Sequence, residues 1–217
     1  MMLDRGKHRS IVASTICEIE GALPLVTEGM LDEVCSSGRD SKYNSISHGS
    51  SLSQCLYGFP IGGSALPRLR ELRKFIKVSL MVDDEQQIQL LERFASDHPE
   101  LDPWQIFIKV DVGSHRAGLD MSLPCMKSLL SRAERSNAVS IQGIYCHAGH
   151  SYGCRTKESV EEVLQVELDE VLKAARELSP KQTPLVLSIG STPTAHSIKF
   201  IRDQLPREFI LELHAGR

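Results

Sequence analysis

The stretch Leu185-Val-Leu-Ser-Ile-Gly-Ser-Thr-Pro-Thr-Ala-His196 decides the fold. Its apolar run, rich in branched residues, predicts a buried strand that stops at Gly190. Ser191 and Thr192 can then cap a helix whose first residue is Pro193, where a missing N–H costs nothing. This order of strand, glycine, hydroxyl residues and helix directs backbone N–H groups at one spot, and anions bind there. On this segment alone, an ordinary capped helix after a strand is an open alternative.

The same pattern recurs along the chain. The predicted strands cover residues 10–15, 55–61, 75–82, 104–111, 140–147, 185–189 and 209–214, and the predicted helices cover 18–25, 66–74, 85–95, 124–134 and 160–178. Strands separated by single helices pair in parallel through right-handed crossovers. The chain has no dinucleotide-binding glycine fingerprint, so seven such units fit a (β/α)8 barrel of the TIM type with one unit missing better than a doubly wound sheet.

Active-site groups in such barrels come from the C-terminal ends of the strands, and this sequence turns polar there. The residues concerned are Glu18, Glu20, Tyr57, Asp83, Asp111, His115, Arg116, those from His147 to Tyr152, those from Ser191 to Thr194, and His214. Phosphate sites in this fold gather after the seventh and eighth strands, which favours the corner at Gly190. Asp111 is expected to cap the turn that follows its strand rather than to act in catalysis.

Composition sets wider bounds. A chain of 217 residues with 41% hydrophobic and 24% charged residues is typical of a soluble globular protein. A net charge of −3 without a basic block gives no case for a nucleic-acid or membrane partner. The N-terminal residues lack a signal-peptide core, and no apolar run is long enough to span a bilayer. The six cysteines lack CxxC spacing, so we expect reduced thiols and a cytoplasmic protein.

Four motifs carry a resemblance to a known family. They are Ile108-Lys-Val-Asp-Val-Gly-Ser-His-Arg-Ala-Gly118, Tyr145-Cys-His-Ala-Gly-His-Ser-Tyr152, Ser188-Ile-Gly-Ser-Thr-Pro-Thr194 and Glu212-Leu-His-Ala-Gly216. In this order they resemble the eukaryotic-type D-serine dehydratases, which belong to the alanine-racemase-like, fold type III pyridoxal-phosphate enzymes. The resemblance covers almost the whole chain apart from one internal stretch. D-threonine aldolase shares the fold, but the sequence of the second motif favours the dehydratases.

The resemblance implies a barrel of the alanine racemase N-terminal type and a lyase that converts D-serine to pyruvate and ammonia by β-elimination. Its implied residues for binding pyridoxal 5'-phosphate are Arg116, His147, Tyr152, Gly190, Ser191, Thr192 and Gly216. Backbone amides around Gly190 would hold the phosphate, and Gly216 would complete the phosphate-binding site from the next strand. Arg116 would reach the phenolic oxygen, and Tyr152 would lie near the pyridine nitrogen. His147 either lines the pocket, together with His150, or only packs at a strand end.

Two departures from the family pattern shape the expected activity. The Schiff-base lysine of the family lies in a first strand upstream of Ile11, and Lys7 matches no lysine motif, so we expect no catalytic residue in this chain. The family's zinc ligands lie in a C-terminal β domain, so we expect no metal site here. Cys146 does not join His147 and His150 in one, because alternate strand residues face opposite ways.

We therefore expect residues 1–217 to form one incomplete pyridoxal-phosphate-binding barrel, an inactive fragment of a D-amino-acid lyase. The alternatives are an enzyme similar to D-threonine aldolase and a non-catalytic cofactor-binding fragment. Whether the chain is itself an enzyme is open, and a homodimer is implied only at full length. Residues 34–55 are serine-rich and predict a disordered insertion within the barrel, either a tolerated surface loop or translated non-coding sequence.

Overall fold

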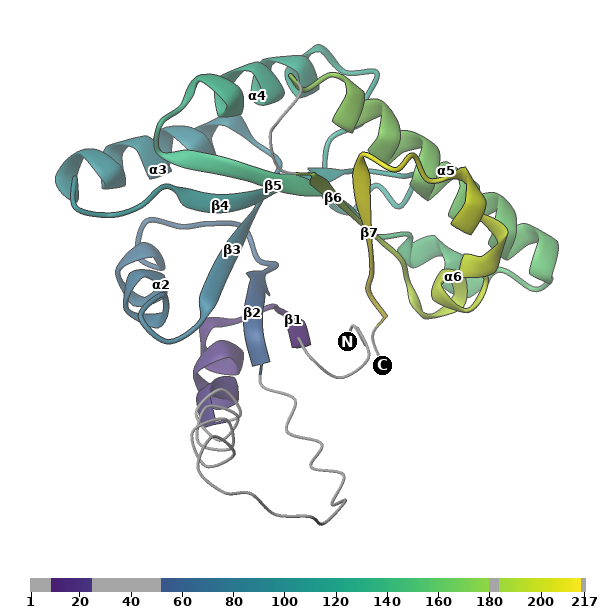
Figure 1. The fold of residues 1–217 in the computed structure, drawn as a ribbon, viewed down its shortest axis with the longest axis horizontal. Coiled ribbons are helices and arrows are strands. Elements are labelled where there is room, and N and C mark those ends of the chain that lie inside the picture. Colours follow the sequence, from purple (N-terminus) through teal and green to yellow (C-terminus); the bar gives the residue numbers. More distant parts are fainter. Residues whose placement is uncertain (1–8, 25–51, 180–183, 216–217) are drawn as a thin grey trace, which may run out of the picture. The chain divides into compact units, whose positions relative to one another are not determined.

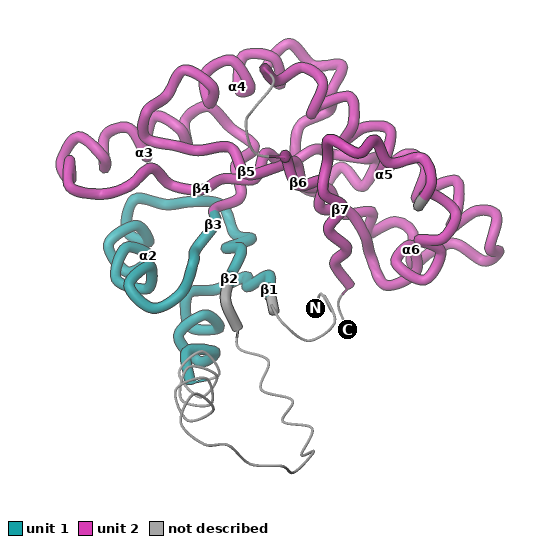
Figure 2. The backbone as a smooth tube through the Cα atoms, viewed as in Figure 1, with its two compact units in different colours: residues 1–79 teal, residues 80–217 magenta. Residues whose placement is uncertain are grey.

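The computed structural model describes residues 9–24, 52–179 and 184–215. The chain divides into two compact units, residues 1–79 and residues 80–217, which Figure 2 distinguishes by colour. In both units strands and helices alternate along the chain (Figure 1), as the sequence predicts.

Unit 1 contains a parallel strand pair with a helix after each strand. Its elements are β1 (Arg9–Ala13), a helical stretch over residues 16–24, β2 (Leu52–Tyr57) and α2 (Leu66–Leu72). The first helix begins where it does because Thr15 and Glu18 cap it reciprocally. The Thr15 hydroxyl accepts from the Glu18 amide at 3.2 Å, and the Glu18 carboxylate accepts from the Thr15 amide at 3.3 Å. β3 (Lys77–Val82) crosses the boundary into unit 2.

Unit 2 carries most of the described chain. Its elements are α3 (Glu85–Asp97), β4 (Trp104–Val110), α4 (Pro124–Arg135), β5 (Val139–Cys146), the 3-10 turn η1 (Gly149–Gly153), α5 (Lys157–Arg176), β6 (Leu185–Ile189), α6 (Thr192–His196), the short turns η2 (Ile198–Phe200) and η3 (Arg202–Gln204), and β7 (Phe209–Leu213). α3 and α5 begin at capping boxes formed by Asp84 with Gln87 and by Thr156 with Ser159.

The strands β4, β5, β6 and β7 lie side by side in chain order, all parallel. The helices α3, α4 and α5 cover one face of these strands (Figure 1). Strands in such sheets are apolar throughout, and Ile106, Phe107 and Ile108 of β4 are all fully buried. On the other face the register places one residue from each strand in a single row. This row, called the interior row below, consists of Lys109, Tyr145, Ser188 and Glu212.

The structure confirms the predicted alternation and shifts some boundaries. β2 covers Leu52–Tyr57 rather than 55–61, because Gly58 and Pro60 follow and proline cannot donate to a ladder. Residues 52–55 thus lie in a strand, and residues 34–51 of the predicted insertion lie outside the described residues. The helix after Gly190 begins at Thr192 instead of Pro193, with Ser191 as its N-cap. Lys7 and Gly216 also lie outside the described residues.

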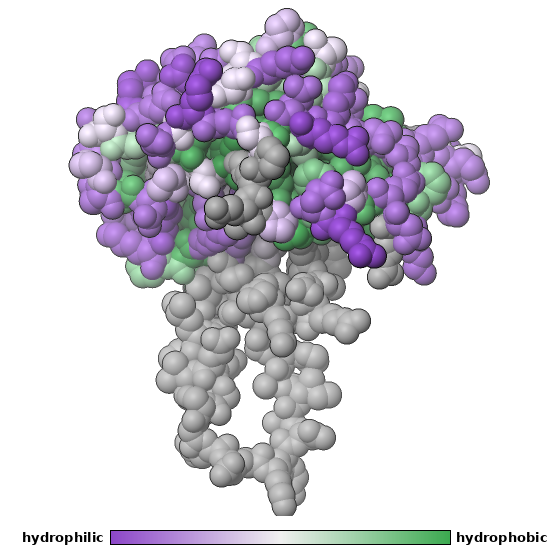
Figure 3. Space-filling view, turned by 45° about the horizontal axis from the view of Figure 1, so that its top comes forward, coloured by the Kyte–Doolittle hydropathy of each residue, from purple (hydrophilic) through white to green (hydrophobic). Residues whose placement is uncertain are grey.

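Polar and charged residues predominate on the face shown in Figure 3, with smaller apolar areas between them. Of the helices in the described part of the chain, not one combines the length and apolar character needed to cross a membrane.

Gly143 offers a test of the packing between β5 and β6. A Cβ at this position would lie 2.0 Å from the carbonyl oxygen of Val186 on the neighbouring strand, so the two backbones would have to separate. We expect Gly143→Ala to lower the free energy of unfolding by about 3 kcal/mol. The control is Gly153→Ala, where the added methyl group meets nothing within 4 Å. Urea unfolding midpoints measure both, and equal midpoints for the two variants would contradict this packing.

Candidate functional site

Aromatic rings gather on the interior face where β5 and β7 end. The Tyr145 ring stacks on the His214 ring with 4.4 Å between centroids and 10° between planes. The His147 ring is tilted against His214 with a centroid distance of 5.7 Å. The Lys109 Nζ lies 5.9 Å from the centre of the Tyr145 ring. Burial raises the pKa of Tyr145, so its hydroxyl stays protonated at neutral pH.

His214 is buried and carries an unused ring nitrogen. Its Nδ1 lies 3.2 Å from the Ser188 hydroxyl, which also forms a hydrogen bond with Glu212 at 3.0 Å. Which of the Ser188 hydroxyl and the His214 Nδ1 is the donor depends on the tautomer of the ring. Among the described residues this Nε2 has no hydrogen-bond partner. Burial, reinforced by the neighbouring His147, lowers the pKa of His214 to about 3, so the ring is neutral.

The tautomer of His147 follows from its partner. Its Nδ1 lies 3.0 Å from the Gly190 carbonyl oxygen, which can only accept. Nδ1 therefore carries the proton, and Nε2 presents a lone pair. Burial lowers the pKa of His147, the hydrogen bond to Gly190 offsets part of this effect, and the charge of Arg116 lowers it further. The sequence left open whether His147 faces a pocket or only packs, and the structure shows that it joins two strand ends.

The corner at Gly190 is held by close backbone packing. Gly190 has φ +131°, and a Cβ there would lie 2.4 Å from the His214 carbonyl oxygen, so glycine is required. The buried Ser191 hydroxyl lies 2.7 Å from that of Ser151 and 2.9 Å from that of Thr194. The Ser191 hydroxyl also accepts from the Thr194 amide, and this hydrogen bond makes Ser191 the N-cap of α6.

Tyr152 closes this corner from the turn η1. Its hydroxyl donates to the Thr192 Oγ1 at 3.2 Å and accepts weakly from the Thr192 amide at 3.5 Å. α6 is only five residues long, so its dipole is small. An anion would be held here by individual donors, namely the amide and the hydroxyl of Thr192.

Asp111 organises the loop that presents Arg116. One carboxylate oxygen of Asp111 accepts from the amides of Gly113, Ser114 and His115 at 3.0 to 3.1 Å. Burial alone would raise the pKa of Asp111, but the hydrogen bonds from His115 and Gly113 outweigh it and lower the pKa. The prediction that Asp111 caps its turn is confirmed. Asp83 holds the far end of the loop through the Gly118 amide at 2.9 Å.

The structure separates two histidines that the sequence places close together. The His147 ring meets Gly190, whereas the His150 ring lies near Gly113 of the Asp111 loop. Cys146 points to the opposite face, where its Sγ lies 3.8 Å from Glu167. Within residues 9–24, 52–179 and 184–215 there is no cluster of three or more His, Cys, Asp or Glu side chains that could hold a metal ion.

Two residues of this region were missed by the sequence reasoning. Lys109 belongs to the interior row, where burial lowers its pKa, Asp83 counteracts that effect and Arg116 adds to it. The strand periodicity could have found it, since Lys109 is two residues before Asp111 on the same face. Glu167 is fully buried on α5, and its signal was a charged residue three positions after Leu164 on an otherwise apolar helix face.

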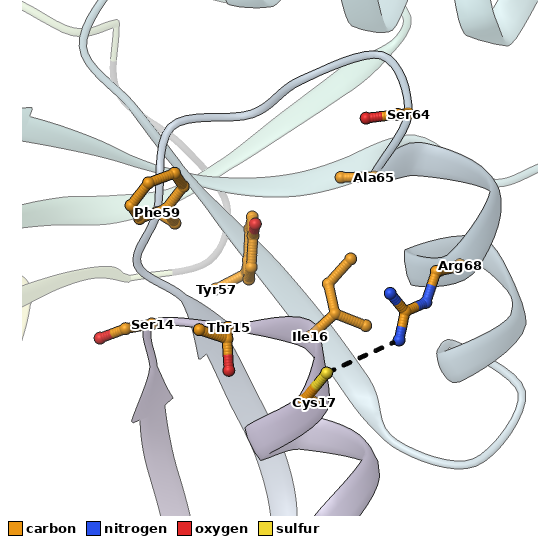
Figure 4. Close-up of a pocket in the computed structure, with 9 residues that line it drawn as sticks. All are labelled: Ser14, Thr15, Ile16, Cys17, Tyr57, Phe59, Ser64, Ala65 and Arg68. Atoms are coloured by element: carbon orange, nitrogen blue, oxygen red, sulfur yellow. Dashed lines mark hydrogen bonds between the residues drawn. The ribbon is translucent and has the colours of Figure 1, made fainter.

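Unit 1 has a separate cavity of about 360 Å³ at the ends of β1 and β2. Figure 4 shows the Arg68 guanidinium turned toward Cys17, with Tyr57 and Phe59 across the cavity. Arg68 also pairs with Glu20 at 2.7 Å, and both side chains are more than 40% exposed. Such an exposed ion pair contributes little to stability. Of the polar residues predicted at these strand ends, Glu18 thus caps a helix and Glu20 pairs with an arginine.

Comparison with known proteins identifies the family. The profile described as "Alanine racemase, N-terminal domain" matches residues 7–205, and the chain belongs to this family. The predicted barrel class is thereby confirmed. Solved structures under 25% identical share the fold: D-threo-3-hydroxyaspartate dehydratase from Delftia sp. HT23 (TM-score 0.62, 21% identity, 97% of this chain and 53% of that chain) and an alanine racemase from Clostridium difficile 630 (TM-score 0.56, 13% identity, 99% and 52%).

Sequence relatives narrow the resemblance. The chain is similar to D-serine dehydratase of Schizosaccharomyces pombe, with 35% identity over 100% of this chain and 49% of the relative. It is also similar to D-serine dehydratase of Saccharomyces cerevisiae, with 32% identity over 96% of this chain and 48% of the relative. The chain thus spans about half the length of the curated relatives it matches.

The buried His214 predicts a pH dependence of stability. Its folded pKa of about 3 lies below the ordinary value of 6.5, so the unfolded chain binds the proton more tightly. Stability from this group is complete above pH 6.5 and is lost as the pH falls toward 3, at about 1.4 kcal/mol per pH unit. Between pH 6 and pH 5, we therefore expect the free energy of unfolding of His214→Gln to fall by about 1.4 kcal/mol less than that of the wild type. The matched control, His196→Gln at an exposed position, should leave the slope unchanged. A wild-type slope in His214→Gln would show that His214 titrates normally.

Proposed function

We propose that this chain is the cofactor-binding barrel of a pyridoxal-phosphate-dependent D-amino-acid lyase that dehydrates D-serine. One observation carries the proposal. Three motifs that are distant in the sequence, the loop with Arg116, the His147 turn and the Gly190 corner, follow the neighbouring parallel strands β4, β5 and β6. The similarity to D-serine dehydratases over the whole chain supports the choice of reaction.

The residues present fit an anionic aromatic cofactor. Lys109 and Arg116 supply positive charge, while the carboxylate of Asp111 is occupied by backbone amides. The Thr192 amide and the Tyr152 hydroxyl are donors at the strand ends. The buried Nε2 of His214 has no hydrogen-bond partner in the described part of the chain and is therefore available to a bound molecule. Pyridoxal phosphate brings an anionic phosphate, a phenolic oxygen and a flat ring.

Each residue has a role that follows from its chemistry. When bound, pyridoxal phosphate supplies an electron-withdrawing ring that stabilises negative charge at the α-carbon of the substrate. Arg116 would hold the phenolic oxygen with a permanent positive charge. Tyr152 would face the ring nitrogen with a neutral hydroxyl, which tempers the withdrawal of electrons. His147 keeps its proton on Nδ1 and offers Nε2 as an acceptor. Gly190 shapes the corner, while its own amide donates to Glu167.

The proposed substrates are small D-amino acids with a hydroxyl group on the β-carbon. D-serine loses its α-hydrogen and β-hydroxyl as water, and hydrolysis of the remaining C–N bond gives pyruvate and ammonia. The relatives named for D-serine and D-threo-3-hydroxyaspartate both act on such molecules. We assign zinc ligands to none of the described residues and propose a homodimer only for a full-length protein. A cytoplasmic location fits the described cysteines, which are all unpaired.

Binding of the cofactor tests the proposal. Titration with pyridoxal phosphate or inorganic phosphate should shift the amide resonances of Gly190, Ser191, Thr192 and Thr194, whereas pyridoxal should not, because the phosphate group is what the donors of this corner recognise. Arg116→Gln should weaken pyridoxal phosphate about tenfold, since a charged partner is lost. The control is Arg135→Gln at the exposed end of α4, which should bind like wild type. Silent amides at 190–194 would mean that the corner is only a helix cap.

A further inference from the structure

A buried carboxyl group lies beneath the candidate site, on the side of the sheet that the helices cover. Glu167 of α5 has no exposed surface, although its neighbours Leu164, Leu168 and Val171 form an apolar face against the strands. Burying a carboxylate costs several kcal/mol unless hydrogen bonds compensate. A leucine at this position would suit the helix face better, so the glutamate has to be explained by what it contacts.

Glu167 joins the ends of two strands. Its Oε1 accepts from the Ala148 amide at 3.2 Å, just after β5, and from the Gly190 amide at 3.1 Å, just after β6. The thiol of Cys146 lies 3.8 Å from the same oxygen. One side-chain atom therefore satisfies two backbone donors that belong to different strand ends and that would otherwise be buried without a partner.

Glu167 is connected to His147 and to the Gly190 corner through the backbone of Gly190. The Gly190 amide donates to Glu167, and the Gly190 carbonyl accepts from the His147 Nδ1. These two hydrogen bonds belong to the peptide groups on either side of the Gly190 Cα, so the backbone angles of Gly190 determine whether both can form. Because that carbonyl sets the tautomer of His147, the orientation of the Gly190–Ser191 peptide group decides which ring nitrogen carries the proton, and Glu167 fixes the peptide group just before it. The next residues along the chain are Ser191 and Thr192 of the corner.

We infer that Glu167 is a positioning residue, which clamps the ends of β5 and β6 together and thereby holds His147 and the Gly190 corner in the geometry for binding the ligand. The part that concerns the ligand rests on the proposed function. The part that concerns His147 does not, because its tautomer can be measured without any ligand. Burial raises the pKa of Glu167, and hydrogen bonds from Thr194, Gly190 and Ala148 offset part of the rise.

Three variants of the full chain test this inference. Glu167→Leu keeps the helix face apolar and removes the acceptor. Glu167→Gln keeps an acceptor oxygen at the same place. Leu168→Ala opens a cavity in the same helix and keeps the Glu167 carboxyl group, which controls for loss of stability alone. Glu162→Gln, at an exposed position of α5, controls for loss of a carboxylate.

The first measurement is the tautomer of His147, read from the ¹⁵N shifts of its ring nitrogens. We expect Nδ1–H in the wild type, in Glu167→Gln and in both controls, and a mixture of tautomers in Glu167→Leu. The second is the affinity for pyridoxal phosphate, which should fall about tenfold in Glu167→Leu and be restored in Glu167→Gln. A folded Glu167→Leu with the wild-type tautomer and wild-type affinity would overturn the inference.

The remaining outcomes are also decisive. If the wild type fails to bind pyridoxal phosphate but Glu167→Leu changes the tautomer, the proposed function fails and the clamp stands. If Glu167→Leu does not fold, Glu167→Gln decides the matter through the amide protons of Ala148 and Gly190. Both should shift, because an amide oxygen is a weaker acceptor than a carboxylate, while Leu168→Ala leaves them in place. Unshifted amide protons in Glu167→Gln would contradict the clamp.

Discussion

The parallel register of β4 to β7 is the constraint on which the candidate site depends. Parallel pairing, with one register shift between Ile106 and Phe107 of β4, brings Lys109, Tyr145 and Ser188 into one row, although they come from segments separated by whole helices. A shift by one residue in any strand would exchange the interior face for the helix-covered face. Cys146 marks this alternation, because it lies between Tyr145 and His147 and points to Glu167 instead. The chemistry of the site is thus a consequence of strand pairing.

Close backbone packing at Gly190 fixes the conformation of the corner. The α-carbon of Gly190 lies so near the His214 carbonyl that a side chain has no room, and its φ is one that side chains rarely adopt. Its amide and carbonyl are both used, by Glu167 and by His147. A corner with this many fixed contacts loses little entropy when it binds a ligand, which favours recognition through few donors. Preorganisation therefore matters more here than the dipole of the five-residue helix α6.

Much of the fold could be predicted, because strand and helix periods differ and the apolar runs are distinct. The order of elements and the cap at Asp111 follow from local patterns. The cap at Ser191 also follows from the local pattern, but local patterns could not show that its hydroxyl contacts Ser151 from another turn. Nor could they show what Glu167 contacts. Its carboxylate oxygen accepts from amides at the ends of two different strands, and this is visible only in the folded structure. Gly216 lies outside the described residues, so its predicted role stays a prediction.

Burial and charge act together at the interior row. Burial keeps Tyr145, His147 and His214 neutral, so these rings contribute acceptors and donors without net charge. The positive charge of Lys109 is opposed by Asp83 and Asp111, whose oxygens already accept from backbone amides. An arriving anion gains from the cations and meets carboxylates whose charge is partly compensated by those amides. Because burial lowers the pKa of both His147 and His214, the positive charge of this region comes from Lys109 and Arg116 rather than from the rings.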